Sequence, residues 1–288
     1  MSKARQSPLR SIAAHAILLT YTLIALFPVY VVVVNSFKNK KGIFASPLSL
    51  PFGDLWSPDG YAKVWLRGDF PLYFQNSLIV TVVALFFVLL FGAMAAFALS
   101  EYRFKLNSLT GLYLALGIMI PIRLGTVAIL QLMSSSGLTD PSGPFGRAAP
   151  LTALILVYTA QGLPLAIFIL SEFMQTVSND LKNAGRIDGM NEYKIFFRLV
   201  LPLVRPAMAT VAVFTMIPIW NDLWFPLILA PSETTKTVTL GAQMFLGQFQ
   251  SEWDAVLAAL ALAILPVLIL YLIFSRQLIR GITSGAVK

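Results

Sequence analysis

The chain reads LKNAGRIDGMNEYKIFFRLVLP from Leu181 to Pro202, and this polar, amphipathic stretch lies between two long apolar runs. Ser178-Asn-Asp180 provides residue types that cap helix N-termini, so a helix is expected to begin at about Leu181. Asp188-Gly189 predicts a turn at the end of that helix. The loop at about 178–202 is therefore expected to place a short helix across the membrane face.

The second half of the loop predicts another helix, which begins at Glu192 and is expected to end at Leu201-Pro202. In the first helix, the apolar face consists of Leu181, Ala184, Gly185 and Ile187, and the polar side of Lys182, Asn183 and Arg186. Small residues on such a face allow a partner to approach closely. The residues alone leave two interpretations open, which are a docking surface and an ordinary amphipathic helix at the membrane interface.

The composition places the rest of the chain in lipid. Of its 288 residues, 57% are hydrophobic and 12% are charged, and the mean hydropathy is +0.77. Soluble domains carry about 25% charged residues. The chain has no cysteine and its one histidine, His15, lies in an apolar run, so no metal site is expected. The net charge of +8 is attributed to basic cytoplasmic loops and not to nucleic-acid binding.

Six segments are long and apolar enough to cross a bilayer, which requires about 20 residues. They are about 11–35, 75–99, 108–130, 150–171, 204–229 and 255–275. Pro121 and Arg123 interrupt the third segment. The expected fold is an all-α integral membrane protein with six transmembrane helices, in which residues 1–288 form a single transmembrane domain.

The basic residues predict the orientation. With both termini in the cytoplasm, 13 of the 21 Lys and Arg residues lie inside and 8 lie outside. Lys and Arg are retained on the cytoplasmic side, so this arrangement is the favoured one.

Asn221 and Asp222 are polar residues well inside an apolar run. An ionisable residue within a membrane span is by default a functional candidate. Both are candidates for contact with a solute or with a partner protein. The alternative for Asp222 is a structural bond to a neighbouring helix or to a partner chain.

Catalysis is not expected of this chain. It has no Gly-rich phosphate-binding motif that ends in Lys-Ser/Thr, and no credible Ser/His/Asp set. One alternative function is a self-contained secondary transporter or channel, a class that often shows internal repeats. No convincing repeat is found. A membrane-embedded enzyme is a third alternative, which the missing catalytic set disfavours.

Ala184-Gly-Arg-Ile-Asp-Gly-Met190, followed by Phe196-Phe-Arg-Leu-Val-Leu-Pro-Leu-Val-Arg-Pro-Ala207, resembles the EAA loop of ABC importer permeases. The likeness is to the MalG-like half of maltose-type carbohydrate importers. Further matching segments are Phe74–Ser77, Ala98–Phe104, Trp220–Pro226 and Arg280–Lys288. One departure is that the stretch corresponding to Glu-Ala-Ala reads Lys182-Asn-Ala-Gly185 and lacks the glutamate.

The resemblance implies a type I ABC importer permease in the bacterial inner membrane, with the loop as a coupling helix. The implied ATPase-coupling residues are Asn183, Ala184, Gly185, Arg186, Ile187, Asp188, Gly189 and Met190, and the implied ATPase-contacting tail residues are Arg280, Gly285 and Lys288. The implied partners are a second homologous permease, two ATP-binding subunits that hold ATP and Mg, and an extracytoplasmic sugar-binding protein. This chain itself is expected to bind no cofactor, and the resemblance leaves the sugar unspecified.

Overall fold

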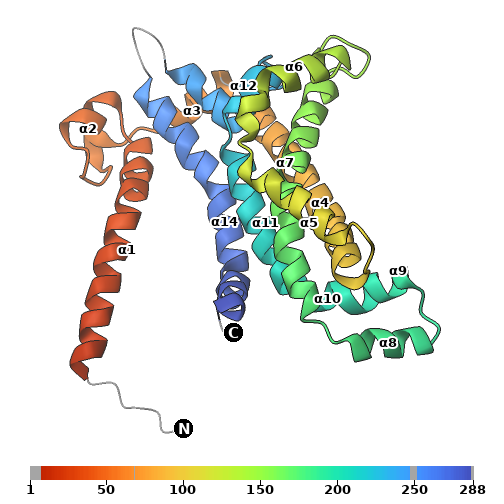
Figure 1. The fold of residues 1–288 in the computed structure, drawn as a ribbon. Helices are drawn as coiled ribbons and strands as arrows, with labels where there is room; N and C mark the ends of the chain where they lie inside the picture. Colours follow the sequence, from red (N-terminus) through yellow and green to blue (C-terminus); the bar gives the residue numbers. More distant parts are fainter. Residues whose placement is uncertain (1–7, 68, 247–251, 287–288) are drawn as a thin grey trace. The chain divides into compact units, whose positions relative to one another are not determined.

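The computed structural model describes residues 8–67, 69–246 and 252–286, and its contacts divide the chain into two compact units. One unit comprises residues 1–70 and 242–264, and the other comprises residues 71–241 and 265–288. Figure 1 shows the helices of both. Over the described ranges the chain forms no β-strand, apart from an isolated bridge between Lys38 and Trp56. The all-α fold expected from the sequence is confirmed.

The first unit holds a long apolar helix followed by short helices. Its elements are α1 (Pro8–Ser36), α2 (Lys40–Ala45), η1 (Gly53–Leu55), α3 (Asp59–Arg67), η4 (Gln243–Phe245) and the beginning of α14 (Trp253–Ala286). Lys38, which follows α1, is fully buried and donates hydrogen bonds to the Ser46 carbonyl at 2.7 Å and to Asn35 Oδ1 at 3.0 Å. Burial lowers the pKa of Lys38 below its ordinary value. Lys38 therefore ties the end of α1 to the segment around Ser46, where the chain turns back.

The second unit contains most of the helices. Its elements are α4 (Phe70–Glu101), α5 (Asn107–Met119), η2 (Ile122–Gly125), α6 (Thr126–Ser135), α7 (Ala148–Gln175), α8 (Asn179–Ile187), α9 (Glu192–Lys194), the π-helical η3 (Ile195–Val200), α10 (Leu201–Leu203), α11 (Arg205–Asn221), α12 (Trp224–Leu229) and α13 (Val238–Ala242). Helices α4, α7 and α11 form its centre. One apolar cluster lies around Phe97, Leu170 and Ile195, and another around Leu154 and Phe225.

Helices α4 and α7 approach each other closely through small residues. A Cβ on Gly92 would lie only 2.9 Å from the Cβ of Ala166, so the position has no room for a larger residue. Ala93 and Ala96 on the same helix are fully buried. Close packing through small residues is typical of helices within a membrane.

Three helices, Ser11–Ser36, Phe70–Glu101 and Ala148–Gln175, are long and apolar enough to cross a membrane, and two bent pairs raise the number to five. A shorter apolar helix covers Trp253–Ile269. The expected third span is one of the bent pairs: α5 and the η2–α6 segment differ in direction by 83°. Pro121 explains the break, because a proline drives the residue before it, Ile120, into extended backbone.

The expected fifth span, 204–229, is also discontinuous. Helix α11 ends at Asn221, Asp222 has extended backbone, and α12 begins at Trp224. Each of the six predicted spans thus coincides with apolar helical segments, but two of them contain breaks. The breaks lie at Ile120-Pro121 and at Asp222.

Candidate functional site

The polar loop between α7 and α11, residues 178–204, begins with a well-capped helix. The Ser178 side chain accepts a hydrogen bond from the Asp180 N–H at 3.1 Å at the start of α8. At the other end, Met190 N–H donates to the Gly185 carbonyl at 2.9 Å and Gly189 N–H to the Arg186 carbonyl at 3.1 Å. Gly189 has a φ of +79°, in the left-handed region. This hydrogen-bond pair and the left-handed glycine form a Schellman ending, which confirms the expected turn.

The inward face of α8 is charged and not apolar. Lys182 is only 5% exposed, and its Nζ donates a hydrogen bond to Glu101 Oε2 at the end of α4. Gly185 is also buried, and a Cβ there would meet the Leu199 side chain at 2.9 Å. Helix α8 therefore rests on α4 and on the returning segment through one glycine and one buried ion pair.

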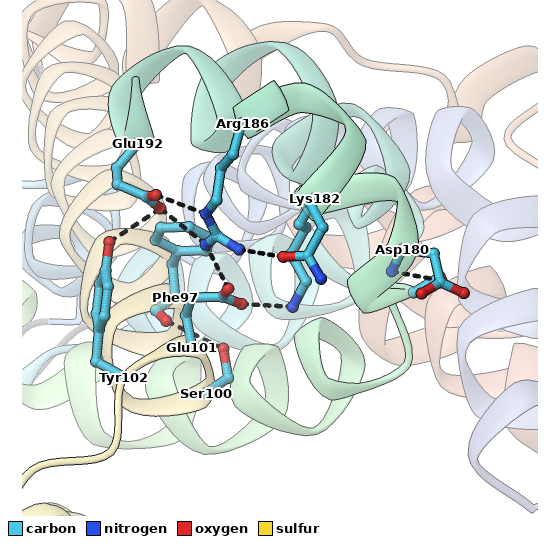
Figure 2. Close-up of polar contacts among 10 residues, drawn as sticks. Phe97, Ser100, Glu101, Tyr102, Asp180, Lys182, Arg186 and Glu192 are labelled. Carbon is cyan, nitrogen blue, oxygen red and sulfur yellow. Dashed lines mark hydrogen bonds and ion pairs between the residues drawn. The ribbon is translucent and has the colours of Figure 1, made fainter. Parts of the chain in front are cut away.

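Arg186 extends this ion pair into a network that Figure 2 shows. One guanidinium nitrogen of Arg186 lies 2.6 Å from Glu101 Oε1, and Nε donates to Glu192 Oε1 at 2.8 Å. Tyr102 Oη donates to Glu192 Oε2 at 3.0 Å. The hydrogen bonds to Glu192 and Glu101 raise the pKa of Arg186 above its ordinary value. The network therefore ties α8 to the end of α4 and to α9.

The sequence analysis does not anticipate Glu101, Tyr102 and Glu192 as site residues. Glu101 lies 81 positions before Lys182, and a pair so distant along the chain leaves no local pattern. Two signals were available: Glu101 is a lone acid at the end of an apolar run, and it lies within the matching segment Ala98–Phe104.

The outward face of α8 is apolar and exposed. Ile187 is 87% exposed and Leu181 is 41% exposed. Ala184 and Asp188 are also exposed, and all four lie on one face of the helix by their spacing. We call this face, made of Leu181, Ala184, Ile187 and Asp188, the exposed ridge. The basic residues Lys182 and Arg186 of α8 point inward, whereas the apolar side chains Leu181 and Ile187 are exposed. Exposed apolar surface of this kind is suited to a protein partner.

The remaining coupling residues of the sequence analysis lie around this ridge. Asn183 and Gly189 are exposed, whereas Arg186 and Met190 are partly buried. Asn183 Oδ1 accepts a hydrogen bond from Arg186 at 2.9 Å. The structure thus brings all eight residues from Asn183 to Met190 into one helix and its turn, and their contact with an ATPase stays a prediction.

The returning helix differs from the expectation that it ends at Leu201-Pro202. It runs from Glu192 to Leu203, and a bend of 75° separates it from α11. Residues Ile195–Val200 are π-helical, and the Leu201 N–H donates to the Phe196 carbonyl, five residues earlier. The wider π-turn precedes Pro202, which has no N–H to donate. A π-helix is rare in proteins and occurs mostly as a single-turn bulge inside an α-helix, as it does here. The bend therefore comes after the proline, at Val204.

Asp222 is held by four donors. Tyr158 Oη donates to Oδ2 at 2.8 Å, Phe225 N–H to Oδ2 at 3.1 Å, Trp224 N–H to Oδ1 at 3.3 Å, and Arg123 lies 3.4 Å from Oδ1. The Asp222 side chain is 8% exposed, while neighbouring Asn221 is exposed. These contacts favour the alternative in which the Asp222 carboxylate makes structural bonds to neighbouring helices. A contact with solute or binding protein stays a prediction for both residues.

The tail residues lie at the end of α14. Arg280 and Gly285 are part of this helix, which is described to Ala286, and Lys288 lies outside the described residues. Over the described part of the chain, no group of three or more His, Cys, Asp or Glu side chains is arranged to hold a metal ion.

Comparison with known proteins gives one consistent result. Residues 9–284 match the family model of the binding-protein-dependent transport system inner membrane component. A diacetylchitobiose uptake system permease of Streptomyces coelicolor is 31% identical over 292 residues, covering 100% of this chain and 93% of that protein. A melibiose, raffinose and stachyose import permease of Bacillus subtilis is 30% identical, covering 91% of each.

A solved structure shares the fold. A chain of a bacterial ABC transporter that imports the acidic polysaccharide alginate superposes with a TM-score of 0.77 at 20% identity, covering 96% of this chain and 99% of that one. At this identity the likeness shows the fold, which is that of an ABC importer permease.

Proposed function

Because the chain belongs to the family of binding-protein-dependent transport system inner membrane components, which are multi-pass membrane proteins, we propose that it is the permease subunit of an ATP-driven carbohydrate importer. The related permeases of Streptomyces coelicolor and Bacillus subtilis are named for saccharides, which supports this class of solute. Residues 1–288 act as one transmembrane domain with both termini in the cytoplasm, and they form half of the translocation pore.

The observation that carries the proposal is the construction of α8. Its exposed ridge offers apolar surface to a partner, while the network of Glu101, Lys182 and Arg186 fixes its other side to α4. A helix that transmits force needs both properties. A partner that moves the ridge also moves α4 and the returning helix, because buried ion pairs resist separation.

The partner at the ridge is an ATP-binding subunit, and two such subunits hold ATP and Mg. This chain contributes no catalytic group and no cofactor site. Its coupling surface is formed by Asn183–Met190, and the tail residues Arg280, Gly285 and Lys288 contact the same ATPase dimer. A second permease completes the pore, and an extracytoplasmic binding protein delivers the sugar. The solved alginate importer bound to a periplasmic protein supports this last partner.

The decisive test is Ile187→Glu. This substitution puts a charge on the most exposed apolar residue of the ridge, which is 87% exposed and has no role in packing the chain itself. We expect the second permease to co-purify as before and the ATPase to be lost, because a charge without a partner at the centre of an interface costs several kcal/mol. Affinity purification followed by quantitative mass spectrometry measures both.

Phe145→Glu is the matched control, because Phe145 is also strongly exposed, at 69%, but lies outside the polar loop. The control variant should retain the ATPase. Retention of the ATPase by Ile187→Glu would contradict the docking surface. If the wild-type chain co-purifies with no ATPase at all, the chain is a self-contained transporter and the proposed function is wrong.

A further inference from the structure

An ion pair links two of the helix breaks in the second unit, the one at Ile120-Pro121 and the one at Asp222. Arg123 lies just after the break at Ile120-Pro121, Asp222 forms the break between α11 and α12, and their side chains are 3.4 Å apart. Within a membrane, broken backbone is tolerated only where it is buried in protein or lines a water-filled cavity. In transporters, such discontinuous helices commonly surround the solute.

A cavity of about 600 Å³ lies at the first break. Its wall is formed by residues of the α5–η2 segment, including Ile118, Pro121 and Arg123, and of α7, including Gln161 and Leu165. A volume of this order accommodates a small ligand. A second cavity of about 100 Å³ shares Gln161 and Leu165 with the first.

Three polar side chains that line these cavities have hydrogen-bonding capacity to spare. The Arg123 side chain is 66% exposed, and one of its nitrogens donates a hydrogen bond to Asp222. The Gln161 side chain is exposed and makes no hydrogen bond with the described residues. The Thr215 hydroxyl, in the wall of the smaller cavity, is buried without a hydrogen-bond partner among them. The walls are otherwise mainly apolar.

Asp222 positions Arg123, and four donors already contact its buried carboxylate. The pair is close to neutral overall, yet Arg123 keeps free N–H donors. Gln161 adds an amide donor and an acceptor. A neutral molecule with several hydroxyl groups matches this set, whereas an anion would meet a guanidinium whose charge Asp222 already offsets.

We propose that Arg123 and Gln161 hydrogen-bond the hydroxyl groups of a neutral saccharide during its passage, so that this subunit contributes to solute selection. This inference rests on the proposed function as a carbohydrate permease. A guanidinium exposed to hydrocarbon is costly, which favours water over lipid in the cavity.

The test uses the complete importer in cells and measures uptake of melibiose, raffinose, diacetylchitobiose and an alginate oligosaccharide. The variants are Arg123→Gln and Gln161→Ala, and the control is Gln131→Ala, an exposed glutamine on α6 away from both cavities. A contact that the solute makes during its passage is expected to change maximal rates of uptake. We expect about tenfold changes in the rate ratios between neutral saccharides for Arg123→Gln, with smaller changes for Gln161→Ala and none for the control.

A second measurement asks whether the cavity is open to water. The chain has no cysteine, so Gln161→Cys creates a single reactive thiol. In the assembled complex in nanodiscs, a water-soluble methanethiosulfonate reagent should label it, and the transported saccharide should slow the labelling. A thiol that is never labelled would show that lipid or the second permease covers the cavity, which would overturn the proposal.

The other possible results of the uptake and co-purification measurements each contradict a different claim. Equal loss of uptake for every saccharide in Arg123→Gln would assign Arg123 a purely structural role and contradict the solute contact. Loss restricted to the alginate oligosaccharide would show recognition of a carboxylate and overturn the assignment of a neutral saccharide. Failure of the unmodified chain to co-purify with an ATPase would contradict the proposed function itself, whatever the uptake ratios are.

Discussion

Glu101→Gln is expected to abolish most of the coupling between solute and ATP hydrolysis. The substitution keeps the size of the side chain but leaves Lys182, which is 5% exposed, and Arg186 without their shared negative charge. Removing one partner of a buried ion pair costs about 3–5 kcal/mol. Helix α8 should then separate from α4, so movement of the exposed ridge no longer reaches the membrane helices. Solute-stimulated ATP hydrolysis of the assembled complex measures the loss.

Hydrogen exchange of the α8 backbone amides separates this mechanism from general misfolding. Exchange should rise in α8 and stay unchanged in the core of α7. The double variant Glu101→Gln with Lys182→Met should recover much of the protection, because an apolar side chain of similar length removes the unpaired buried charge.

Glu233→Gln is the matched control for the same chemical change. Glu233 pairs with Lys236, but its side chain is 62% exposed, and exposed ion pairs contribute at most about 1 kcal/mol. Its other contact, a hydrogen bond accepted from Tyr73 Oη at 2.8 Å, can also be accepted by the amide oxygen of glutamine. Coupling should therefore be close to normal. If Glu101→Gln and Glu233→Gln behave alike, the buried network does not transmit force.

Gly189→Val is expected to lower solute-stimulated ATP hydrolysis about tenfold. Gly189 has a φ of +79°, and no atom lies within 4 Å of a Cβ built there, so the penalty comes from the backbone and not from a clash. The left-handed conformation costs an ordinary residue roughly 1–2 kcal/mol, and about 1.4 kcal/mol corresponds to a factor of ten. The Schellman ending of α8 would open and shift the exposed ridge.

Two controls accompany this variant. Gly189→Asn should retain most of the activity, because asparagine tolerates the left-handed conformation. Gly137→Val introduces the same strain at a φ of +71°, also with open space around the Cβ, but outside the polar loop. Gly137→Val should leave coupling intact. Full coupling in Gly189→Val would contradict the assignment of the loop.

Much of the architecture could be predicted because its signals are local. Apolar runs longer than the bilayer is thick identify the membrane helices, and a capping serine and a glycine place the ends of α8 within a residue or two. The breaks inside the third and fifth predicted spans were harder. Pro121 marked the first, but the second depends on Asp222, which ends α11 and accepts hydrogen bonds from the first residues of α12.

The burial of the polar side of α8 could not be predicted. The face expected to meet a partner is exposed at Leu181, Ala184 and Ile187 but buried at Gly185. Lys182, expected on the polar side, is buried against an acid 81 positions away. Whether a lysine can be buried depends on the presence of that acid, which local sequence does not reveal.

The all-α membrane fold, the polar loop with its turn and the lack of catalytic motifs can be read from composition and from neighbouring residues. The anchoring of α8 by Glu101 and the placement of Arg123 at a cavity by Asp222 appear only when the helices are packed together. Both are contacts between residues about 80–100 positions apart, formed when separate helices pack. Long-range pairing of charges follows from the packing of whole helices, and no single segment encodes it.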